Sequence, residues 1–337
     1  MSGSRGAGER RYSTAIVGAT GFTGALLAEL VERHPSLELA QVSSDTAAGR
    51  PVRELLPRVR ATDLVFRRHD DAGGVDAAFV CLPDGAAAPI VKRLLEEGVR
   101  VVDLSPDFRL PAEAYARWYG EHPFPEMLPG VYGLTEINRE TVRGAQLVAN
   151  PGCYPTAALL ALTPLLPLGL EDVVVDAKSG VSGAGKAATE KTHFCSVDSE
   201  VLAYGVAGHR HYPEIAAGIG AGDGGPSLVF VPHLVPLQRG ITESIYVRAA
   251  ETPSPEDLRA RYEQAYAGEP FVDLCDEPPR LRDVVGTNRC RIFPTLDARS
   301  GRILVFSVID NLMKGACGQA LQNMNLMLGL AETEGLT

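Results

Sequence analysis

Short apolar runs and stretches with helical spacing alternate along the first half of the chain. Residues 13–17 (STAIV) predict a buried strand, and the segment ALLAELVERH soon after it places apolar residues on one helix face at positions 26, 27, 30 and 31. Further strands are expected at residues 37–43, 64–66, 76–82, 100–104 and 146–149, and a helix at residues 86–97. Strands that alternate with helices predict right-handed βαβ units, so we expect an α/β domain with a parallel sheet.

The pattern changes after the segment ANPGCYPTAALLAL. Residues 172–178, 227–235, 241–249 and 302–309 resemble strands, and residues 255–267 are the one clear helix among them. Many strands with few helices predict an α+β domain with a mostly antiparallel sheet. Near the C-terminus, Cys317, Leu321, Met324 and Leu328 share one helix face, which predicts that Cys317 is a core residue.

Composition narrows the class of protein. The chain has 337 residues, enough for two domains of ordinary size. A net charge of −10 argues against a nucleic-acid partner, and proline breaks the longest apolar runs before they reach the ~18 residues of a membrane span. Six scattered cysteines without a C-x-x-C pair predict neither a zinc site nor a disulfide framework. They fit a reducing compartment, so we expect a cytoplasmic protein without a membrane partner.

The segment GATGFTG, residues 18–24, carries three glycines spaced G-x-x-G-x-x-G between a predicted strand and a predicted helix. In that context the glycines allow a tight turn and a close backbone approach to a pyrophosphate, which N–H groups at the helix start bind. The alternative is a strand–helix turn that is merely tight. We predict a Rossmann domain whose loop contacts a dinucleotide through Gly18, Thr20, Gly21, Phe22, Thr23 and Gly24.

The end of the second predicted strand bears on which dinucleotide binds. Folds that prefer NAD usually place Asp or Glu there, to hold the ribose 2′-hydroxyl. Here the strand ends in Ser43 and Ser44, with Asp45 slightly later and Arg50 nearby. Hydroxyl groups and a guanidinium suit a 2′-phosphate, so we expect NADP(H), with contacts from Ser43, Ser44 and Arg50.

A second glycine-rich segment, SGVSGAGKA, contains the pattern G-x-x-x-x-G-K from Gly180 to Lys186. A phosphate-binding P-loop continues with Ser or Thr to hold magnesium, but this chain has Ala187. The segment also lies outside the domain that the first strand organises. A kinase is therefore disfavoured, and an anion-binding loop near the cofactor or the substrate is the better interpretation.

One cysteine stands at a Pro-Gly corner, in NPGCYP. Pro155 suits the first turn of a helix, so Cys153 is expected just before the helix begins. The helix dipole and the free N–H groups would favour the thiolate and lower the pKa of Cys153, which predicts a nucleophile. The alternative is a small packed residue.

A cysteine nucleophile needs a partner that moves protons, and His209-Arg210-His211 is the most distinctive histidine cluster. If the segment is extended, its two histidines lie on one face. A metal site would need further ligands and no third one is evident, so we expect no metal. An acid–base role for one histidine is the better interpretation, and Glu214 follows closely enough to orient an imidazole.

The motifs together resemble those of the N-acetyl-γ-glutamyl-phosphate reductases of arginine biosynthesis, which are relatives of aspartate-semialdehyde dehydrogenase. They appear in the family's order over nearly the whole chain: GATGFTG, VVDLSPDFRL, ANPGCYPTA, SGVSGAG, GHRHYPEI, FVPHLVPLQRGI and DNLMKGACGQALQNMNLMLG. The combination of NPGCYPT with HRH-x-PEI is specific, whereas many reductases share GATGFTG. The resemblance implies NADPH-dependent reduction of a small-molecule acyl phosphate through a cysteine thioester, in a homodimer or homotetramer.

The resemblance also implies roles for individual residues. Cys153 is the nucleophile, His209 is the general acid/base, and Glu214 supports His209. The residues expected at the substrate are Arg109, Asn150 and Arg210, with Arg109 near the phosphate and Arg210 near another anionic group.

The end of the chain is expected to return to the nucleotide-binding domain. The resemblance places the nicotinamide near Ser182, Gly183, Asn311 and Gly315. The expected divisions are a flexible leader over residues 1–12, a Rossmann domain over 13–152 and 311–337, and a catalytic and dimerisation domain over 153–310.

Some positions depart from the family pattern. Asp45 stands where arginine is common, Asp84 where histidine is frequent, Thr135 where proline is usual, and Tyr212 where threonine is common. They leave open a sister group that reduces an aminoadipyl phosphate carried on a small acidic protein, although the segment THFCSVDSEVLAYGVAG looks more like the arginine enzymes. Another acyl phosphate reductase and a catalytically inactive NADP-binding sensor are the remaining alternatives.

Overall fold

The parallel sheet expected in the first half of the chain is present in the computed structural model, which describes residues 11–61, 63–222 and 224–337. Its six described strands run in the order β2-β1-β3-β4-β6-β5, and every neighbouring pair is parallel. All residues of the central strand β3 are buried, as expected where helices cover both faces of a sheet. The strands are β1 (Tyr12–Val17), β2 (Leu37–Ser43), β3 (Ala77–Val80), β4 (Arg100–Asp103), β5 (Val131–Tyr132) and β6 (Leu147–Ala149).

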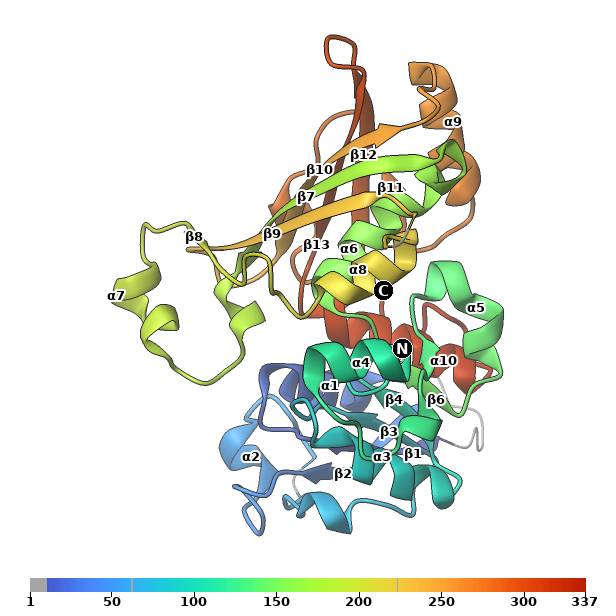
Figure 1. Cartoon of the computed structure of the whole chain (residues 1–337). Helices are drawn as coiled ribbons and strands as arrows, with labels where there is room; N and C mark the ends of the chain where they lie inside the picture. The colour runs from blue at the N-terminus through green and yellow to red at the C-terminus, as the bar shows by residue number, and fades with distance from the viewer. Residues whose placement is uncertain (1–10, 62, 223) are drawn as a thin grey trace, which may run out of the picture.

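Helices flank this sheet, and they include the last helix of the chain. The final segment returns from the second domain as a π-helix, η7 (Met313–Cys317), that continues into α10 (Gly318–Met327) (Figure 1). Cys317 and Leu321 are fully buried in one cluster with Leu27 and Val102, which confirms the core position of Cys317. The other helices of this domain are α1 (Phe22–Arg33), α2 (Val52–Leu55), α3 (Ala87–Glu96), α4 (Ala112–Tyr119) and α5 (Thr135–Arg143), with the 3-10 turns η1 (His69–Asp71) and η2 (Pro125–Met127).

The second domain is a mixed sheet with helices packed on one face (Figure 1). Its described strands run in the order β11-β12-β13-β10-β7-β9-β8, and four of the six neighbouring pairs are antiparallel, which confirms the expected α+β domain. The strands are β7 (Leu170–Gly180), β8 (Leu202–Ala203), β9 (Ser227–Val235), β10 (Ile241–Ala249), β11 (Val272–Leu274), β12 (Cys290–Asp297) and β13 (Arg302–Ile309). The packed helices are α6 (Cys153–Leu162) with its 3-10 extension η3 (Thr163–Leu168), α8 (Tyr212–Ile219) and α9 (Pro255–Ala265).

A long excursion between β7 and α8 projects away from the body of the second domain (Figure 1). It holds the short elements η4 (Val181–Ala184), η5 (Glu190–Thr192), α7 (Phe194–Val197) and β8. One more 3-10 turn, η6 (Leu281–Asp283), precedes β12. Among the described residues no helix combines the length and the apolar character needed to cross a membrane.

Several local predictions differ from the structure. Residues 64–66 are not a strand, because Val65 makes only an isolated bridge to Pro51; Arg67, just after them, makes another to Ser43. The HRH segment is a turn that leads into α8 rather than an extended stretch. Strand β12 was not expected, and it contains Pro294. This proline lies beyond the three residues that pair with β11, so it stands on a free edge, where proline is tolerated. The expected leader lies outside the described residues up to residue 10, and β1 begins at Tyr12.

Candidate active site

Two cavities meet at Cys153. One, of about 540 Å³, is lined by Cys153, Arg109, His209 and His211 among other residues. The other, of about 310 Å³, shares Cys153, Arg109 and His211 and extends to the glycine loop and to Gly315. The thiol therefore lies where a small molecule in the larger cavity would meet a nucleotide in the smaller one.

Cys153 is the first residue of α6, and no side chain caps this helix start. A Cβ at residue 152 would lie 2.7 Å from Nε2 of His211, so glycine is required for the ring to approach this closely. Burial raises the pKa of the Cys153 thiol to about 12, against the opposing effect of the Tyr154 backbone N–H. The expectation of a lowered pKa was wrong, because desolvation outweighs the helix start. The thiol therefore needs a base.

Glu214 binds the backbone just before the nucleophile. Its carboxylate accepts hydrogen bonds from the N–H of Gly152 (2.9 Å), the hydroxyl of Tyr132 (3.0 Å) and the guanidinium of Arg109 (3.0 Å). The side chains of Arg109 and Glu214 are only 8% and 1% exposed. The structure thus corrects the expectation that Glu214 orients an imidazole, since its carboxylate binds these three donors and neither His209 nor His211 is among them.

His209 and His211 lie against each other, with ring centroids 5.0 Å apart. Nδ1 of His209 accepts a hydrogen bond from the backbone N–H of His211 (3.1 Å), so the neutral ring carries its proton on Nε2. Nδ1 of His211 has no hydrogen-bond partner among the described residues. Burial lowers the pKa of His209 to about 4 and that of His211 well below its usual value. Both rings are therefore neutral near pH 7. Unlike Nδ1 of His209, Nδ1 of His211 is not hydrogen-bonded to the backbone.

The described residues also bear on the expectation about metals. No group of His, Cys, Asp or Glu side chains in the part of the chain that the structure describes is arranged to hold a metal ion. The six cysteines are all free thiols.

The glycine loop fits a dinucleotide. Gly18 has φ +83°, and a Cβ there would collide with the carbonyl of Cys81. A Cβ at Gly24 would collide with the carbonyl of Gly18, so this glycine brings α1 against β1. Gly21 and the next two residues, Phe22 and Thr23, line the smaller cavity. No side chain caps α1, which leaves the N–H groups of its first turn for a pyrophosphate.

The carboxyl end of β2 presents the hydroxyl groups expected there. Oγ1 of Thr20 lies 3.1 Å from Oγ of Ser44, which in turn lies 3.2 Å from Oγ1 of Thr46. Ser43 is buried beside them, and its hydroxyl contacts a histidine ring. Arg50 is exposed and pairs with a glutamate in α2 instead of reaching this group.

Residues 67–69 bring two further cations to the end of β2, which the sequence analysis did not identify. The N–H of Ser44 donates to the carbonyl of Arg67 (2.9 Å), and the N–H of Arg67 donates to the carbonyl of Val42 (3.0 Å). A hydrogen bond from the backbone N–H of residue 69 lowers the pKa of the Asp45 carboxyl, and the charge of Arg68, which follows Arg67, adds to this effect. The signal was the dipeptide Arg67-Arg68 after a predicted strand, but only the fold shows that it reaches β2.

The residues expected around a nicotinamide lie together. Ser182, Gly183, Asn311 and Gly315 all line the smaller cavity. Nδ2 of Asn311 donates to Oγ of Ser182 (3.0 Å), which ties the C-terminal segment to the 180–186 loop. Lys186 of this loop also lines the cavity and donates to a backbone carbonyl of the glycine loop. The P-loop-like segment is thus placed where an anion of the cofactor would lie.

Two of the expected substrate residues are already engaged. Oδ1 of Asn150 accepts a hydrogen bond from Asn323 (3.2 Å), and its Nδ2 donates to the carbonyl of Ala316 (3.3 Å). Asn150 is buried, so it joins β6 to the C-terminal segment instead of presenting a free amide. Arg210 lines the larger cavity and pairs with Asp84 at 2.7 Å, so the unusual aspartate supplies its partner.

Known protein families match this chain in sequence over both domains. The chain matches the family described as "Semialdehyde dehydrogenase, NAD binding domain" over residues 13–145 and the one described as "Semialdehyde dehydrogenase, dimerisation domain" over residues 153–311. An N-acetyl-gamma-glutamyl-phosphate reductase from Dehalococcoides mccartyi is 47% identical over 334 residues, which cover 97% of this chain and 98% of the relative. The chain belongs to the N-acetyl-γ-glutamyl-phosphate reductase family. Another N-acetyl-gamma-glutamyl-phosphate reductase, from Azotobacter vinelandii, is also 47% identical and covers 95% of this chain and 96% of its own length.

Solved structures of aspartate semialdehyde dehydrogenases have the same fold as this reductase-family chain. Aspartate semialdehyde dehydrogenase II from Vibrio cholerae aligns with a TM-score of 0.74 at 20% identity, over 95% of this chain and 99% of that one. The enzyme from Candida albicans, solved with NADP, aligns with a TM-score of 0.67 at 17% identity, over 94% and 98% of the two chains. At these identities the likeness shows the fold alone.

Proposed function

We propose that this protein reduces N-acetyl-γ-glutamyl phosphate to N-acetylglutamate semialdehyde and phosphate, with NADPH as the reductant, in arginine biosynthesis. The observation that carries the proposal is the position of Cys153 on the wall that the two cavities share. A nucleophilic thiol at such a junction suits covalent capture of an acyl group on one side and its reduction from the other. The named relatives at 47% identity supply the substrate class.

The chemistry begins with the thiolate of Cys153. It attacks the acyl carbon, a C–S bond forms, and the C–O bond to phosphate breaks, so that phosphate leaves with a proton. When bound, NADPH supplies the hydride that adds to the thioester carbon. The thiohemiacetal then collapses to the aldehyde and the thiolate, which takes up a proton again. In this scheme the backbone N–H groups at the start of α6, a helix start that no side chain caps, would stabilise the oxyanion.

The proton steps fall to the histidine pair. The resemblance implies His209 as the general acid/base, and His209 lines the larger cavity with its proton on Nε2, where it is a donor. His211 lines both cavities, and its Nδ1 has no hydrogen-bond partner among the described residues. We therefore assign to His211 the removal of the thiol proton and to His209 the donation of a hydrogen bond or proton to the substrate oxygen.

Two arginines supply positive charge to the larger cavity. Arg109 is close enough to the thiol for its charge to oppose the rise in the pKa of Cys153, so a phosphate beside the thiol would lie in its field. Arg210 lies at the exposed rim, where its pairing with Asp84 leaves the rest of the guanidinium for a carboxylate. An acyl phosphate with a second anionic group matches this distribution.

The cofactor assignment rests on the end of β2. The hydroxyl groups there and the nearby Arg67 and Arg68 suit a 2′-phosphate, and neither Ser43, the last residue of β2, nor Ser44 after it offers a carboxylate to a ribose 2′-hydroxyl. The proposed cofactor is therefore NADP(H). In this assignment Arg67 and Arg68, rather than Arg50, bind the 2′-phosphate.

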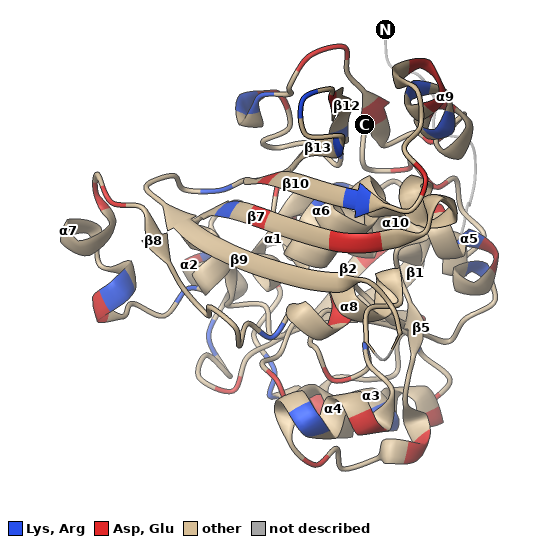
Figure 2. Ribbon diagram, turned by 45° about the horizontal axis from the view of Figure 1, so that its top comes forward, with Lys and Arg blue, Asp and Glu red and all other residues tan. Residues whose placement is uncertain are grey.

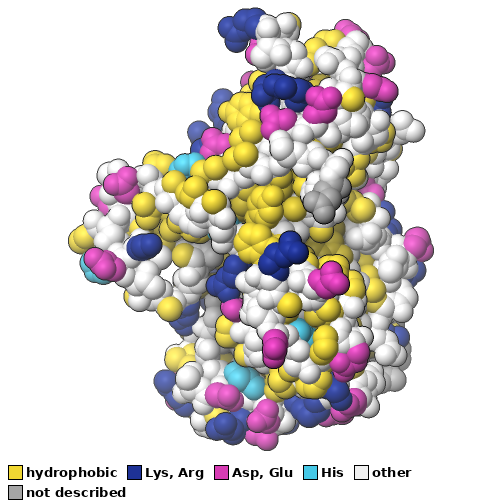
Figure 3. All heavy atoms as spheres, in the orientation of Figure 1, with side chains coloured by type: hydrophobic (Ala, Val, Ile, Leu, Met, Phe, Trp, Pro, Cys, Tyr) yellow, Lys and Arg dark blue, Asp and Glu magenta, His cyan; other side chains and the backbone are white. Residues whose placement is uncertain are grey.

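The outer face of the second-domain sheet supports assembly into a homo-oligomer. Val229 of β9 and Tyr246 of β10 are 48% and 36% exposed on this face. Figure 2 shows β9 without a charged position beside β7, which carries charged residues, and Figure 3 shows hydrophobic side chains on the second domain. A sheet face of this kind pairs with a second copy by a two-fold axis, so a dimer is the smallest assembly proposed. The free thiols suit the cytoplasm as the place of action.

The test is oxidation of NADPH by the purified protein with three acyl phosphates in parallel. N-acetyl-γ-glutamyl phosphate is expected to give the highest kcat/KM, above aspartyl phosphate and above a carrier-linked aminoadipyl phosphate. A higher value with either of the other two would replace the proposal with that rival reductase. Binding of NADPH without turnover of any of them, together with an unreactive Cys153, would indicate a sensor.

A further inference from the structure

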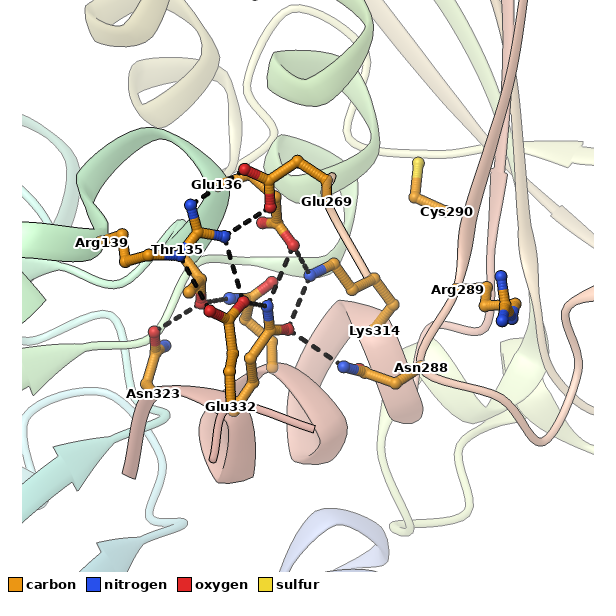
Figure 4. A network of polar contacts seen from close by, with 12 residues as sticks. Thr135, Glu136, Arg139, Glu269, Asn288, Arg289, Cys290, Lys314, Asn323 and Glu332 are labelled. Atoms are coloured by element: carbon orange, nitrogen blue, oxygen red, sulfur yellow. Dashed lines mark hydrogen bonds and ion pairs between the residues drawn. The ribbon is translucent and has the colours of Figure 1, made fainter. Parts of the chain in front are cut away.

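A lysine is buried one residue away from the wall of the active site. Lys314 belongs to the π-helix η7, and its Nζ donates to Glu136 of α5 (2.5 Å) and to Oε1 of Gln322 in α10 (2.9 Å). The side chains of Lys314 and Glu136 are both 0% exposed. Nζ also lies 5.8 Å from the ring centroid of Phe271. Figure 4 shows the ammonium group turned into this cluster and away from solvent.

The cluster joins three parts of the chain (Figure 4). Gln322 donates to Glu136 (3.1 Å) and to Glu332 (2.8 Å), and Arg139 pairs with Glu332 (2.8 Å) and with Glu269. Glu136 and Arg139 come from α5 of the first domain, Gln322 and Glu332 from the C-terminal segment, and Glu269 from the second domain. The ion pair of Lys314 is therefore anchored to both domains.

The opposite side of η7 touches the nucleophile. A Cβ on Gly315 would lie 2.8 Å from Cβ of Cys153, so the backbone of η7 lies directly against this residue. The carbonyl of Ala316 accepts the hydrogen bond from Asn150, three residues before Cys153. A π-helix is rare and often marks a functional site, because it shifts the side chains of one turn relative to an α-helix. Here it places Lys314 in the cluster and Gly315 at the thiol.

Stability alone does not account for this ion pair. Removing two charges from water costs free energy that their attraction repays only in part, and apolar residues of similar size often stabilise a core equally well. Hydrogen bonds to Glu136 and Gln322 do, however, specify where η7 lies along α5 and α10. An apolar contact would leave that position less defined.

We propose that the buried Lys314–Glu136 ion pair positions Cys153, by holding η7 so that Gly315 sets the thiol between the two cavities. Lys314 touches neither cavity, so it is a positioning residue. The inference rests on the proposed function for its effect on turnover, but the position of the thiol itself is measured without any substrate.

The experiment replaces both charges at once, with Lys314→Met and Glu136→Gln, so that neither partner is left charged and buried. We expect kcat to fall by about 10–100-fold, the effect of a small misplacement, while the KM for substrate and the Kd for NADPH change little. The midpoint of the pH dependence of Cys153 alkylation by iodoacetamide is expected to shift. The matched control removes the ion pair between Arg259 and Glu263 (2.8 Å) in α9, outside both cavities, with Arg259→Met and Glu263→Gln, and is expected to change neither readout.

A folded double variant with the native kcat and the native alkylation profile would overturn the proposal. If the double variant does not fold, Gly315→Ala decides, because it inserts a methyl group against Cys153 and leaves the ion pair intact. It is expected to show the same loss of kcat and the same shift in alkylation, and native values in both would overturn the proposal. If the native protein turns over no acyl phosphate, the proposed function fails, while the alkylation profiles of the variants still decide the positioning role.

Discussion

Arg109 and Glu214 form an ion pair with an N–O distance of 3.0 Å that joins the two domains beside the nucleophile. Glu214 lies in α8, and Arg109 follows β4. The same carboxylate accepts the N–H of Gly152, so it holds the corner from which Cys153 projects. Because both charges are buried, removal of one leaves the other without compensation.

Substitution Glu214→Gln is therefore expected to lower the free energy of unfolding by about 3–5 kcal/mol. Urea denaturation measures this change. The control is Glu54→Gln, which removes the exposed partner of Arg50 and is expected to cost about 0.5 kcal/mol or less. Equal losses from the two substitutions would show that burial of the Arg109–Glu214 pair does not matter.

Substitutions of His209 and His211 are expected to slow different steps of the reaction. Loss of a residue that moves a proton lowers the rate by about 10²–10⁴-fold, and His211→Asn is expected to slow the release of phosphate in a single turnover by this factor. His209→Asn is expected to affect turnover with a smaller effect on the pH dependence of thiol alkylation. His193→Asn, at the start of α7 and outside both cavities, is the control. Native phosphate release in His211→Asn would return the base role to His209.

Glu243 gives the protein a pH-dependent stability. Burial raises the pKa of this carboxyl well above 4.5, and neither of its oxygens has a partner among the described residues. The group stays protonated when folded but ionises near pH 4.5 when unfolded, so its stabilising contribution is full below that pH and falls as the pH rises toward the folded pKa.

Substitution Glu243→Gln is expected to remove this decline. Its free energy of unfolding should exceed that of the native chain by an amount that grows with pH, by up to about 1.4 kcal/mol per pH unit. Urea titrations at acidic, neutral and mildly alkaline pH provide the comparison. A difference that stays constant over this range would mean that Glu243 is ionised in the folded protein.

The choice of NADP over NAD is expected to depend on Arg67 and Arg68. A hydrogen bond to a charged group contributes about 1.5–3 kcal/mol, so replacing both arginines with alanine should raise the Kd for NADPH about tenfold or more and leave the Kd for NADH unchanged. Fluorescence titration of the cofactor measures both constants without turnover. Arg50→Ala is the control, and selective loss of NADPH binding in that variant alone would restore the original assignment.

Much of the fold was predictable because its signals are local. A buried parallel strand such as β3 is a continuous apolar run, and in a sheet packed on one face, such as the one that holds β10, buried residues alternate with more exposed ones. What was missed is short or depends on context. Helix α8 has only eight residues, and Pro294 in β12 is tolerated only because the strand has a free edge there.

The site was predictable in its members but not in their partners. Motifs pointed to Cys153, His209 and Arg109, and the structure places all three on the wall of one cavity, while their roles stay predictions. The carboxylate of Glu214 reaches Arg109 across 105 positions of sequence, and no spacing rule connects them. The pKa of Cys153 was predicted in the wrong direction because the helix start is visible in sequence, whereas the burial that outweighs it is a property of the packed domains.

The central claim is that Cys153 carries the acyl group between the loss of phosphate and the arrival of hydride. The most direct measurement mixes the protein with N-acetyl-γ-glutamyl phosphate in the absence of NADPH and determines the mass of the protein and of its peptides. The account predicts one hydroxylamine-sensitive acyl group on Cys153, none on the other cysteines, and its loss when NADPH is added. Phosphate release without that adduct, or turnover by Cys153→Ala, would contradict it.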